Sequence, residues 1–193
     1  MSDFDLALSI ALGIGLAADT GFRMFLPMLV MSAAAYTGHV QLADSFVWLG
    51  TPSALTLLGV AALAEILAYY IPGVDNLLDA LATPAAFVAG TVVAAAVVTD
   101  LPPLVKWSTA IIAGGGVAGL TQSTTALLRA KSTIFTGGLG NPVVATGELG
   151  GALILSLLAL AAPFATLALV IVLLWLAFRM LRQIARREPP PAR

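Results

Sequence analysis

Cysteine is absent from this chain of 193 residues, and histidine occurs once, at His39. Without thiols the chain forms no disulfides, iron–sulfur clusters or thiolate metal sites, and one imidazole cannot build a histidine-rich metal centre. Charge is also scarce, because 10% of the residues are Asp, Glu, Lys or Arg, against about 25% in soluble domains. We therefore expect no metal, no cofactor and no nucleic-acid partner.

Apolar residues take the place of the missing charge. They make up 60% of the sequence, and the mean hydropathy is +1.01. A soluble domain of this length needs far more polar surface to cover its core. The composition excludes a water-soluble globule and predicts a lipid bilayer as the surrounding medium.

Six apolar runs approach the length of about 20 residues that crosses a hydrocarbon core of about 30 Å. They cover residues 6–22, 52–71, 84–99, 107–128, 142–162 and 164–181. A shorter run, 24–36, carries Pro27 near its start and is interpreted as a re-entrant or interfacial helix, with a seventh span as the alternative. The runs are continuous rather than alternating, so we predict an all-α integral membrane protein.

Basic residues gather at the C-terminal end, at Arg179, Arg182, Arg186, Arg187 and Arg193. The positive-inside rule places this end in the cytoplasm. Six spans put the N-terminus on the same side, and the acidic start of the chain lacks the basic leader of a signal peptide. A seven-span chain with an external N-terminus fits the charges as well. We expect one transmembrane domain, 1–182, and a short tail, 183–193.

The two halves of the sequence share short motifs in the same order. Residues 13–20 align with 114–121, 36–38 with 135–137, and 49–52 with 139–142. These pairs predict two repeats of three spans, 6–100 and 107–182, divided near 100–106. Units with an odd number of spans insert in opposite orientations, which is the inverted-repeat plan of many transporters. The alternative is that Ala- and Gly-rich helices resemble one another by composition alone.

Asp19 and Arg23 stand one helical turn apart at the end of the first run. An acid four residues before a base is the favourable order for an ion pair, so we predict that the two side chains meet if the helix continues. The pair either neutralises itself at the end of a span or takes part in binding. Pro27 just beyond it ends or bends a helix and leaves backbone groups free.

Glu65 is the most isolated charge, since apolar residues flank it on both sides. A carboxylate within a span needs a partner, a water-filled cavity or a function. We expect Glu65 to be a proton site or to pair with Arg129 or Lys131. Glu148, early in the fifth run, is predicted at a similar depth. Tyr69 and Tyr70 near a span end are interpreted as interfacial anchors.

The fourth run is unusually polar for a membrane helix. Small residues, including Gly115 and Gly119, precede a stretch of hydroxyl and amide side chains. Two interpretations stay open: close helix packing with interhelical hydrogen bonds, or a polar path through the bundle. The residues that would line this path are Thr20, Thr121, Gln122, Ser123 and Thr125.

A Gly-rich loop joins the fourth and fifth runs. Arg129 and Lys131 come before it, and Asn141 and Pro142 end it where the next helix begins. Free N–H groups at a helix start accept anions, so the loop is a candidate site for an anion or a phosphate headgroup. The alternative is an anchor formed by cytoplasmic basic residues.

The motif GFRMFLP at 21–27, and GGLGNP at 137–142 followed by Glu148, resemble the bacterial membrane proteins of the domain of unknown function 4126 family. The resemblance extends from Asp5 to about Arg182. It implies a multi-pass inner-membrane protein and supplies no substrate or reaction.

Three function classes are compared. The repeat and the polar fourth run favour a small transporter or channel for a small polar or anionic solute. The alternative is a membrane scaffold or subunit that transports nothing. An enzyme is disfavoured because the chain lacks His-Glu-x-x-His, Gly-x-Ser-x-Gly and phosphate-loop motifs. Six short helices barely enclose a pore, so a homodimer is expected.

Overall fold

The computed structural model describes residues 2–71, 73–99 and 101–185, and the described residues form helices and loops with no strand. The all-α prediction is confirmed. Asp100 at the predicted repeat boundary, Pro72, and the tail residues 186–193 with Arg186, Arg187 and Arg193 lie outside the described residues.

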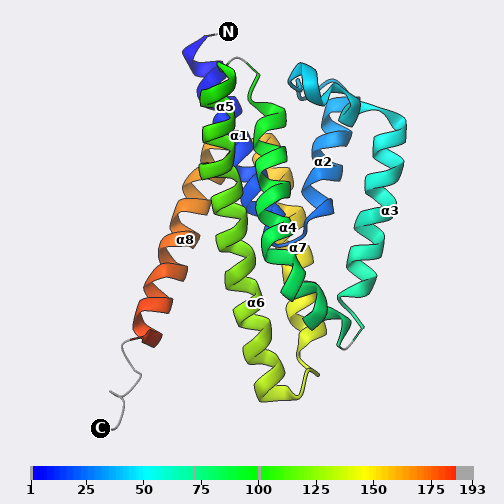
Figure 1. Cartoon of the computed structure of the whole chain (residues 1–193), viewed down its shortest axis with the longest axis vertical. Helices are drawn as coiled ribbons and strands as arrows, with labels where there is room; N and C mark the ends of the chain where they lie inside the picture. Colours follow the sequence, from blue (N-terminus) through cyan, green and yellow to red (C-terminus); the bar gives the residue numbers. More distant parts are fainter. Residues whose placement is uncertain (1, 72, 100, 186–193) are drawn as a thin grey trace.

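Eight α-helices and two short helices of other types follow one another along the described residues. The first group is α1 (Asp3–Thr20), α2 (Phe25–Tyr36), the 3-10 helix η1 (Asp44–Gly50), α3 (Pro52–Ala68) and α4 (Val74–Val97). The second group is α5 (Pro103–Thr109), the π-helical turn η2 (Ala110–Gly115), α6 (Gly116–Thr136), α7 (Asn141–Ala161) and α8 (Pro163–Ala185). Figure 1 shows them as an elongated bundle.

Local sequence explains several helix ends. Ser2 and Asp5 form a capping box at the start of α1, which satisfies backbone N–H groups of the first turn. Thr51 caps α3 and Pro52 follows at its first position, where a proline loses no hydrogen bond. The end of α6 at Gly137 has a φ of +63°, a conformation that favours glycine.

Helix α4 begins ten residues earlier than the predicted run at 84–99. It starts at Val74 and contains Pro84 in its interior. A proline in a membrane helix is tolerated where neighbouring groups satisfy the freed backbone, so treating Pro84 as a break was wrong. The correction matters because the added segment carries Asp75 and Asp79.

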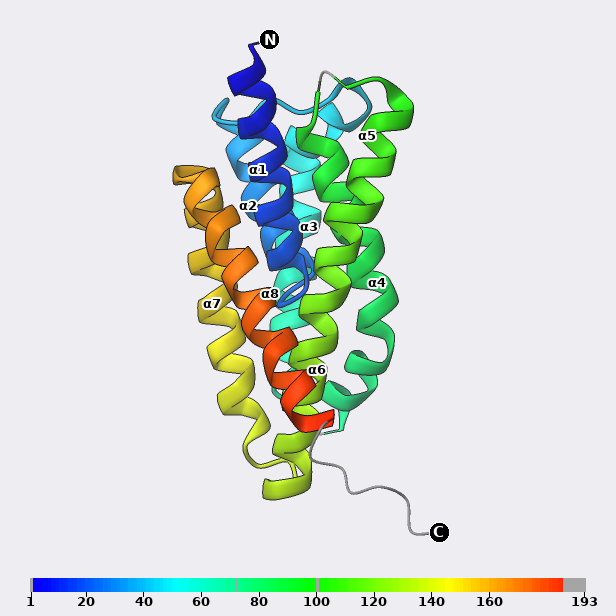
Figure 2. The same cartoon turned by 90° about the vertical axis from the view of Figure 1, so that its left-hand side faces the viewer.

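The connection between α1 and α2, residues 21–24, lies about halfway along the bundle (Figures 1 and 2). Helix α1 descends to this point and α2 returns to the end from which α1 came. The N-terminal end of α1 and the C-terminal end of α8 consequently lie at opposite ends of the molecule. This differs from the prediction that both chain ends share one side, because α1 turns back before it reaches the far end.

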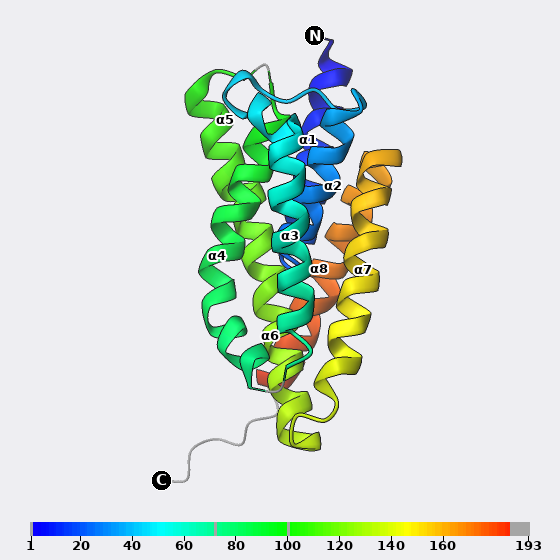
Figure 3. The ribbon, with the colours of Figure 1, turned by 90° about the vertical axis from the view of Figure 1, so that its right-hand side faces the viewer.

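Helices α3, α6 and α8 run downward in Figure 3, and α2, α4 and α7 run upward. Each member of α2–α4 therefore runs opposite to its counterpart in α6–α8. The first landmark pair does not follow this rule, since α1 and α6 run in the same direction.

Length and apolar composition mark three helical stretches as able to cross a membrane: Leu77–Val97, Pro103–Thr136 and Asn141–Ala161. A fourth arises if η1 and α3, bent by 69° at their junction, count as one span. Phe25–Tyr36 and Pro163–Arg179 are apolar but shorter. These helices are consistent with a membrane protein.

Helix α4 and η2 approach each other closely. A Cβ atom at Gly114 would lie 2.5 Å from the Cβ of Ala94 and 2.7 Å from the carbonyl oxygen of Gly90. Of the two glycines predicted to allow close packing, Gly115 does so, because a Cβ atom there would lie 2.9 Å from the carbonyl oxygen of Phe87. A Cβ atom at Gly119 would be 3.8 Å from Phe87, which is an ordinary contact. Helix α3, by contrast, packs mainly against α2 and η1.

Candidate functional site

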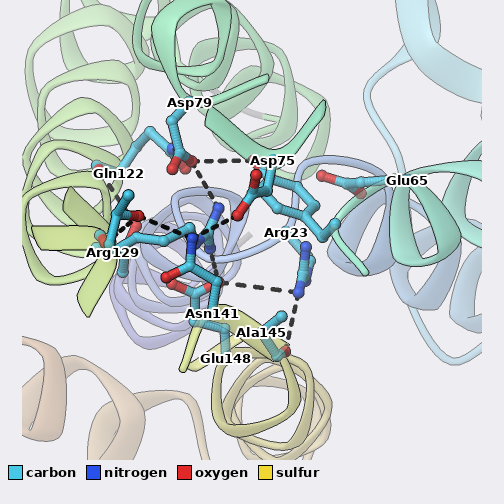
Figure 4. A network of polar contacts seen from close by, with 12 residues as sticks. Arg23, Glu65, Asp75, Asp79, Gln122, Arg129, Asn141, Ala145 and Glu148 are labelled. Carbon is cyan, nitrogen blue, oxygen red and sulfur yellow. Dashed lines mark hydrogen bonds and ion pairs between the residues drawn. The ribbon is translucent and has the colours of Figure 1, made fainter. Parts of the chain in front are cut away.

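Arg129 of α6 is the centre of a buried polar cluster (Figure 4). Its side chain is 1% exposed. Nη1 donates to Oδ1 of Asp79 on α4 at 2.6 Å, and Nη2 pairs with Oε2 of Glu148 on α7. One guanidinium thus bridges two carboxyl groups and joins three helices, because its planar fork presents several N–H donors.

Arg23 enters the same cluster from the α1–α2 connection. Its Nη2 donates to the carbonyl oxygen of Ala145 at 2.9 Å and lies 3.8 Å from Oε2 of Glu148. The predicted ion pair with Asp19 is wrong for this conformation. Helix α1 ends at Thr20, and Arg23 is directed at α7.

Tyr69, directly after α3, lies between the two arginines in the network. The central guanidinium carbons of Arg23 and Arg129 are 4.1 and 4.2 Å from its ring centroid. Cation–π attraction is stronger where water is excluded. The Tyr69 hydroxyl and the amide of Gln122 each lie 3.5 Å from Oδ1 of Asp79.

Glu65 has a different partner from those predicted. Its carboxylate accepts hydrogen bonds from the backbone N–H groups of Met24 at 2.7 Å and Phe25 at 3.0 Å. Arg129 instead pairs with Asp79 and Glu148, and Lys131 is exposed. Because α2 starts at Phe25 with no side-chain cap of its own, Glu65 of α3 serves as that cap and balances the positive end of the helix dipole.

This cap predicts different outcomes for two substitutions. In Glu65→Ala, the two N–H groups lose their acceptor, so we expect unfolding free energy to fall by about 1–2 kcal/mol. Glu65→Gln keeps one acceptor oxygen and is expected to lose less. Amide hydrogen exchange at Met24 and Phe25 measures the local effect. The exchange should be faster in Glu65→Ala than in Glu65→Gln. Equal exchange in both variants would contradict the capping role.

Asn141 extends the cluster toward the α6–α7 loop. Its amide Nδ2 donates to Oδ2 of Asp75 at 2.6 Å and to the Thr133 hydroxyl at 2.9 Å. Asp75 also accepts the backbone N–H of Gly73. The predicted loop site is therefore divided: Arg129 and Asn141 face the bundle interior, while Lys131 is on the surface.

The hydroxyl groups predicted to line a path donate to carbonyls of their own helices. Thr20 donates to Leu16, and in α6 Thr121 donates to Val117, Ser123 to Gly119 and Thr125 to Gln122. Each hydroxyl retains acceptor capacity. The polar path stays a prediction. Gln122, which was predicted to line the path with these hydroxyl residues, contacts Asp79 of the arginine cluster.

Five buried atoms of the cluster have no hydrogen-bond partner among the described residues. They are Nε and Nη1 of Arg23, Nε of Arg129, Oδ1 of Asn141 and Oε1 of Glu148. Buried polar atoms normally bind a protein group, a water molecule or a ligand. The cluster therefore offers donors and acceptors to a small polar molecule.

The GFRMFLP and GGLGNP motifs supply Arg23 and Asn141 to this cluster. The model of the domain of unknown function DUF4126 matches residues 10–183. The chain belongs to this family. No curated protein and no solved structure matches it.

A cavity of about 450 Å³ lies beside the cluster in this DUF4126 protein. Glu65 and Tyr69 supply its polar edge, and most of the remaining lining is Ala and Leu from α3 and α4. Tyr69 lines the cavity and also contacts the guanidinium groups of both buried arginines. One side chain therefore separates this mostly apolar cavity from the arginines.

Three members of the DUF4126 cluster were missed from the sequence: Tyr69, Asp75 and Asp79. Asp75 and Asp79 are four residues apart, a spacing that places both on one face of a helix. This spacing indicates a shared face only if the segment before Pro84 is helical, as it is in α4. Tyr69 carried no signal beyond its place near a span end.

Proposed function

We propose that this DUF4126 protein is a small transporter or channel for a small polar or anionic solute in the bacterial inner membrane. The observation that carries the proposal is the pair of buried arginines, Arg23 and Arg129, with donor groups that have no partner among the described residues. Charges within a membrane are costly and are typical of solute or ion pathways. The α1–α2 connection, which supplies Arg23, lies halfway along the bundle, the depth at which transporters bind substrates.

The helix directions support an inverted repeat made of α2–α4 and α6–α8, six helices in all, with α1 added in front. Charge supports a cytoplasmic position for the end where α8 finishes. Lys131 in the last turns of α6 and Arg179 and Arg182 in those of α8 lie toward that end. The opposite end holds a single described Lys or Arg, Lys106 of α5, so the N-terminus is proposed to be external.

The charge of the cluster bears on the solute. Arg23 and Arg129 face three carboxyl groups of the cluster, Asp75, Asp79 and Glu148, and Glu65 is capped by the start of α2. A neutral polar solute, or an anion that arrives with a proton, adds no further negative charge to this cluster. Nε and Nη1 of Arg23, which have no hydrogen-bond partner among the described residues, are donors for the oxygen atoms of a solute.

Reconstitution in liposomes tests the proposal. We expect acetate, phosphate, glycine or glycerol to enter vesicles that contain the protein at least about tenfold faster than protein-free vesicles. Light scattering after an osmotic step measures the rate of entry. Arg23→Met should abolish the difference, because the solute loses its donors. Arg182→Met, outside the cluster on α8, is the matched control and should leave the rate unchanged. Rates equal to those of empty vesicles for all four solutes would refute the proposal.

A second candidate function, a membrane scaffold or homodimer subunit, has one observation in its favour. Gly147, Gly150 and Gly151 are exposed on α7, and a Cβ atom at any of them would have no neighbour within 4 Å. Gly147 and Gly151 have the spacing of small residues in helix-pair interfaces. If this face binds a second copy, chemical crosslinking in bilayers should give dimers that Gly147→Leu removes, with no solute flux in either protein.

A further inference from the structure

Asp19 lies apart from the arginine cluster and is completely buried. It stands in the last turn of α1 and is 0% exposed. Its Oδ2 is hydrogen-bonded to the hydroxyl of Ser156 on α7, which is also 0% exposed. The other oxygen, Oδ1, has no hydrogen-bond partner among the described residues. Asp19 is thus a carboxyl group with a single neutral partner.

No cation in the described part of the chain is bound to Asp19. Arg23, the nearest base in sequence, is directed at Ala145 and Glu148. Glu65 acts on Asp19 electrostatically, and its charge has the same sign. The helical elements packed on α1 are α2, α4, η2, α6, α7 and α8. Their described charged residues are Asp75, Asp79, Arg129, Lys131, Glu148, Arg179 and Arg182, and none of these is paired with Asp19.

The backbone around Asp19 also disfavours a negative charge. The C-terminal end of a helix carries a partial negative charge from its free carbonyl groups, and Asp19 is in the last turn of α1. Burial, a like charge and the helix end act in the same direction. A carboxyl group in these surroundings is stable only when it is neutral or when it holds a cation.

We propose that Asp19 carries a proton in this conformation and is the residue through which a proton gradient drives the transport suggested above. Its role in transport rests on that proposed function, whereas its protonation does not. In the coupling step the O–H bond of Asp19 breaks, the proton leaves to water, and the carboxylate keeps the electron pair.

Arg23 is placed to form an ion pair with the carboxylate that this step creates. Its backbone N–H donates to the carbonyl oxygen of Asp19 at 3.2 Å, so the two side chains leave the backbone one turn apart. In that order an acid and a base attract each other. Loss of the proton therefore draws Arg23 from Ala145 and Glu148 toward Asp19, and Glu148 keeps Arg129 as its partner. The exchange couples the proton to the arginine that offers donors to the solute.

Infrared spectroscopy of the full chain in lipid tests the protonation directly. We expect the wild type at neutral pH to show the carbonyl stretch of a protonated carboxyl group, and the difference spectrum against Asp19→Asn to contain that band. Asp44→Asn removes an exposed carboxyl group on η1, outside the cluster, and is the matched control that should retain the band. A wild type that matches Asp19→Asn in this region would overturn the proposal. A band that appears only when sodium is replaced by potassium would overturn it too, since Asp19 would then hold sodium.

Two further measurements remove dependence on one variant. Ser156→Ala keeps the carboxyl group and removes its partner, so the band should remain and shift in frequency even if Asp19→Asn does not fold. Dicyclohexylcarbodiimide, which modifies protonated carboxyl groups in apolar surroundings, should label the wild-type α1 peptide, as read by mass spectrometry. An unlabelled α1 peptide alongside an unshifted band in Ser156→Ala would contradict the assignment.

The transport arm separates this inference from the proposed function. In liposomes that take up acetate, an inward proton gradient should speed wild-type uptake by at least about tenfold, and Asp19→Asn should take up acetate at one rate with or without the gradient. Gradient-driven uptake that survives in Asp19→Asn would refute the coupling role alone. Absence of uptake in every protein, with the infrared band present, would refute the transporter and leave Asp19 as a proton-binding residue.

Discussion

Arg129→Met is expected to lower the free energy of unfolding by about 3–5 kcal/mol, because it leaves Asp79 and Glu148 buried without a counter-charge. Arg129 is 1% exposed, and its partners are 11% and 6% exposed, so water cannot replace the lost guanidinium. Detergent-induced unfolding, followed by circular dichroism in mixed micelles, measures the change.

Two comparisons separate charge from shape in this prediction. Arg182→Met removes an arginine that is exposed on α8 and stacked on Phe178, and should change stability by no more than about 0.5 kcal/mol. The triple variant Arg129→Met, Asp79→Asn, Glu148→Gln removes the uncompensated charges and should regain much of the loss. A triple variant as unstable as Arg129→Met would show that the arginine acts through packing instead.

The sequence was sufficient for the helices because lipid permits few alternatives. A continuous apolar run in a bilayer must satisfy its backbone internally, so runs such as 142–162 predict helices directly, and α7 covers Asn141–Ala161. Helix direction was harder. Whether the chain continues or turns back after Thr20 depends on residues 21–24. The shortness of run 24–36 suggested a re-entrant helix, but the length of run 6–22 gave no sign that α1 ends at half depth.

Partners of the buried charges were less predictable for a physical reason. Spacing along one helix suggested Asp19 with Arg23, whereas Arg23 contacts Ala145 and Glu148 on α7, more than a hundred positions away. Contacts between helices depend on rotation and depth, which local sequence does not encode. Glu65 is the clearest case, because its partners are backbone N–H groups of α2 and no side-chain pattern marks them.

The close approach of α4 and η2 positions two residues of the cluster next to each other. Asp79 lies on α4, and Arg129 lies on α6, which follows η2 directly. A Cβ at Gly114 would lie 2.7 Å from the carbonyl oxygen of Gly90, so Gly114→Ala should cost about 1–3 kcal/mol in unfolding free energy and Gly114→Leu more. Gly116, two positions on, has no neighbour within 4 Å of such an atom. Gly116→Ala is therefore the matched control and should stabilise the helix by about 0.5–1 kcal/mol, measured by the same detergent titration. The two alanine variants differ in sign only if backbone contact fixes the spacing of these helices; shifts of the same sign and size would show that it does not.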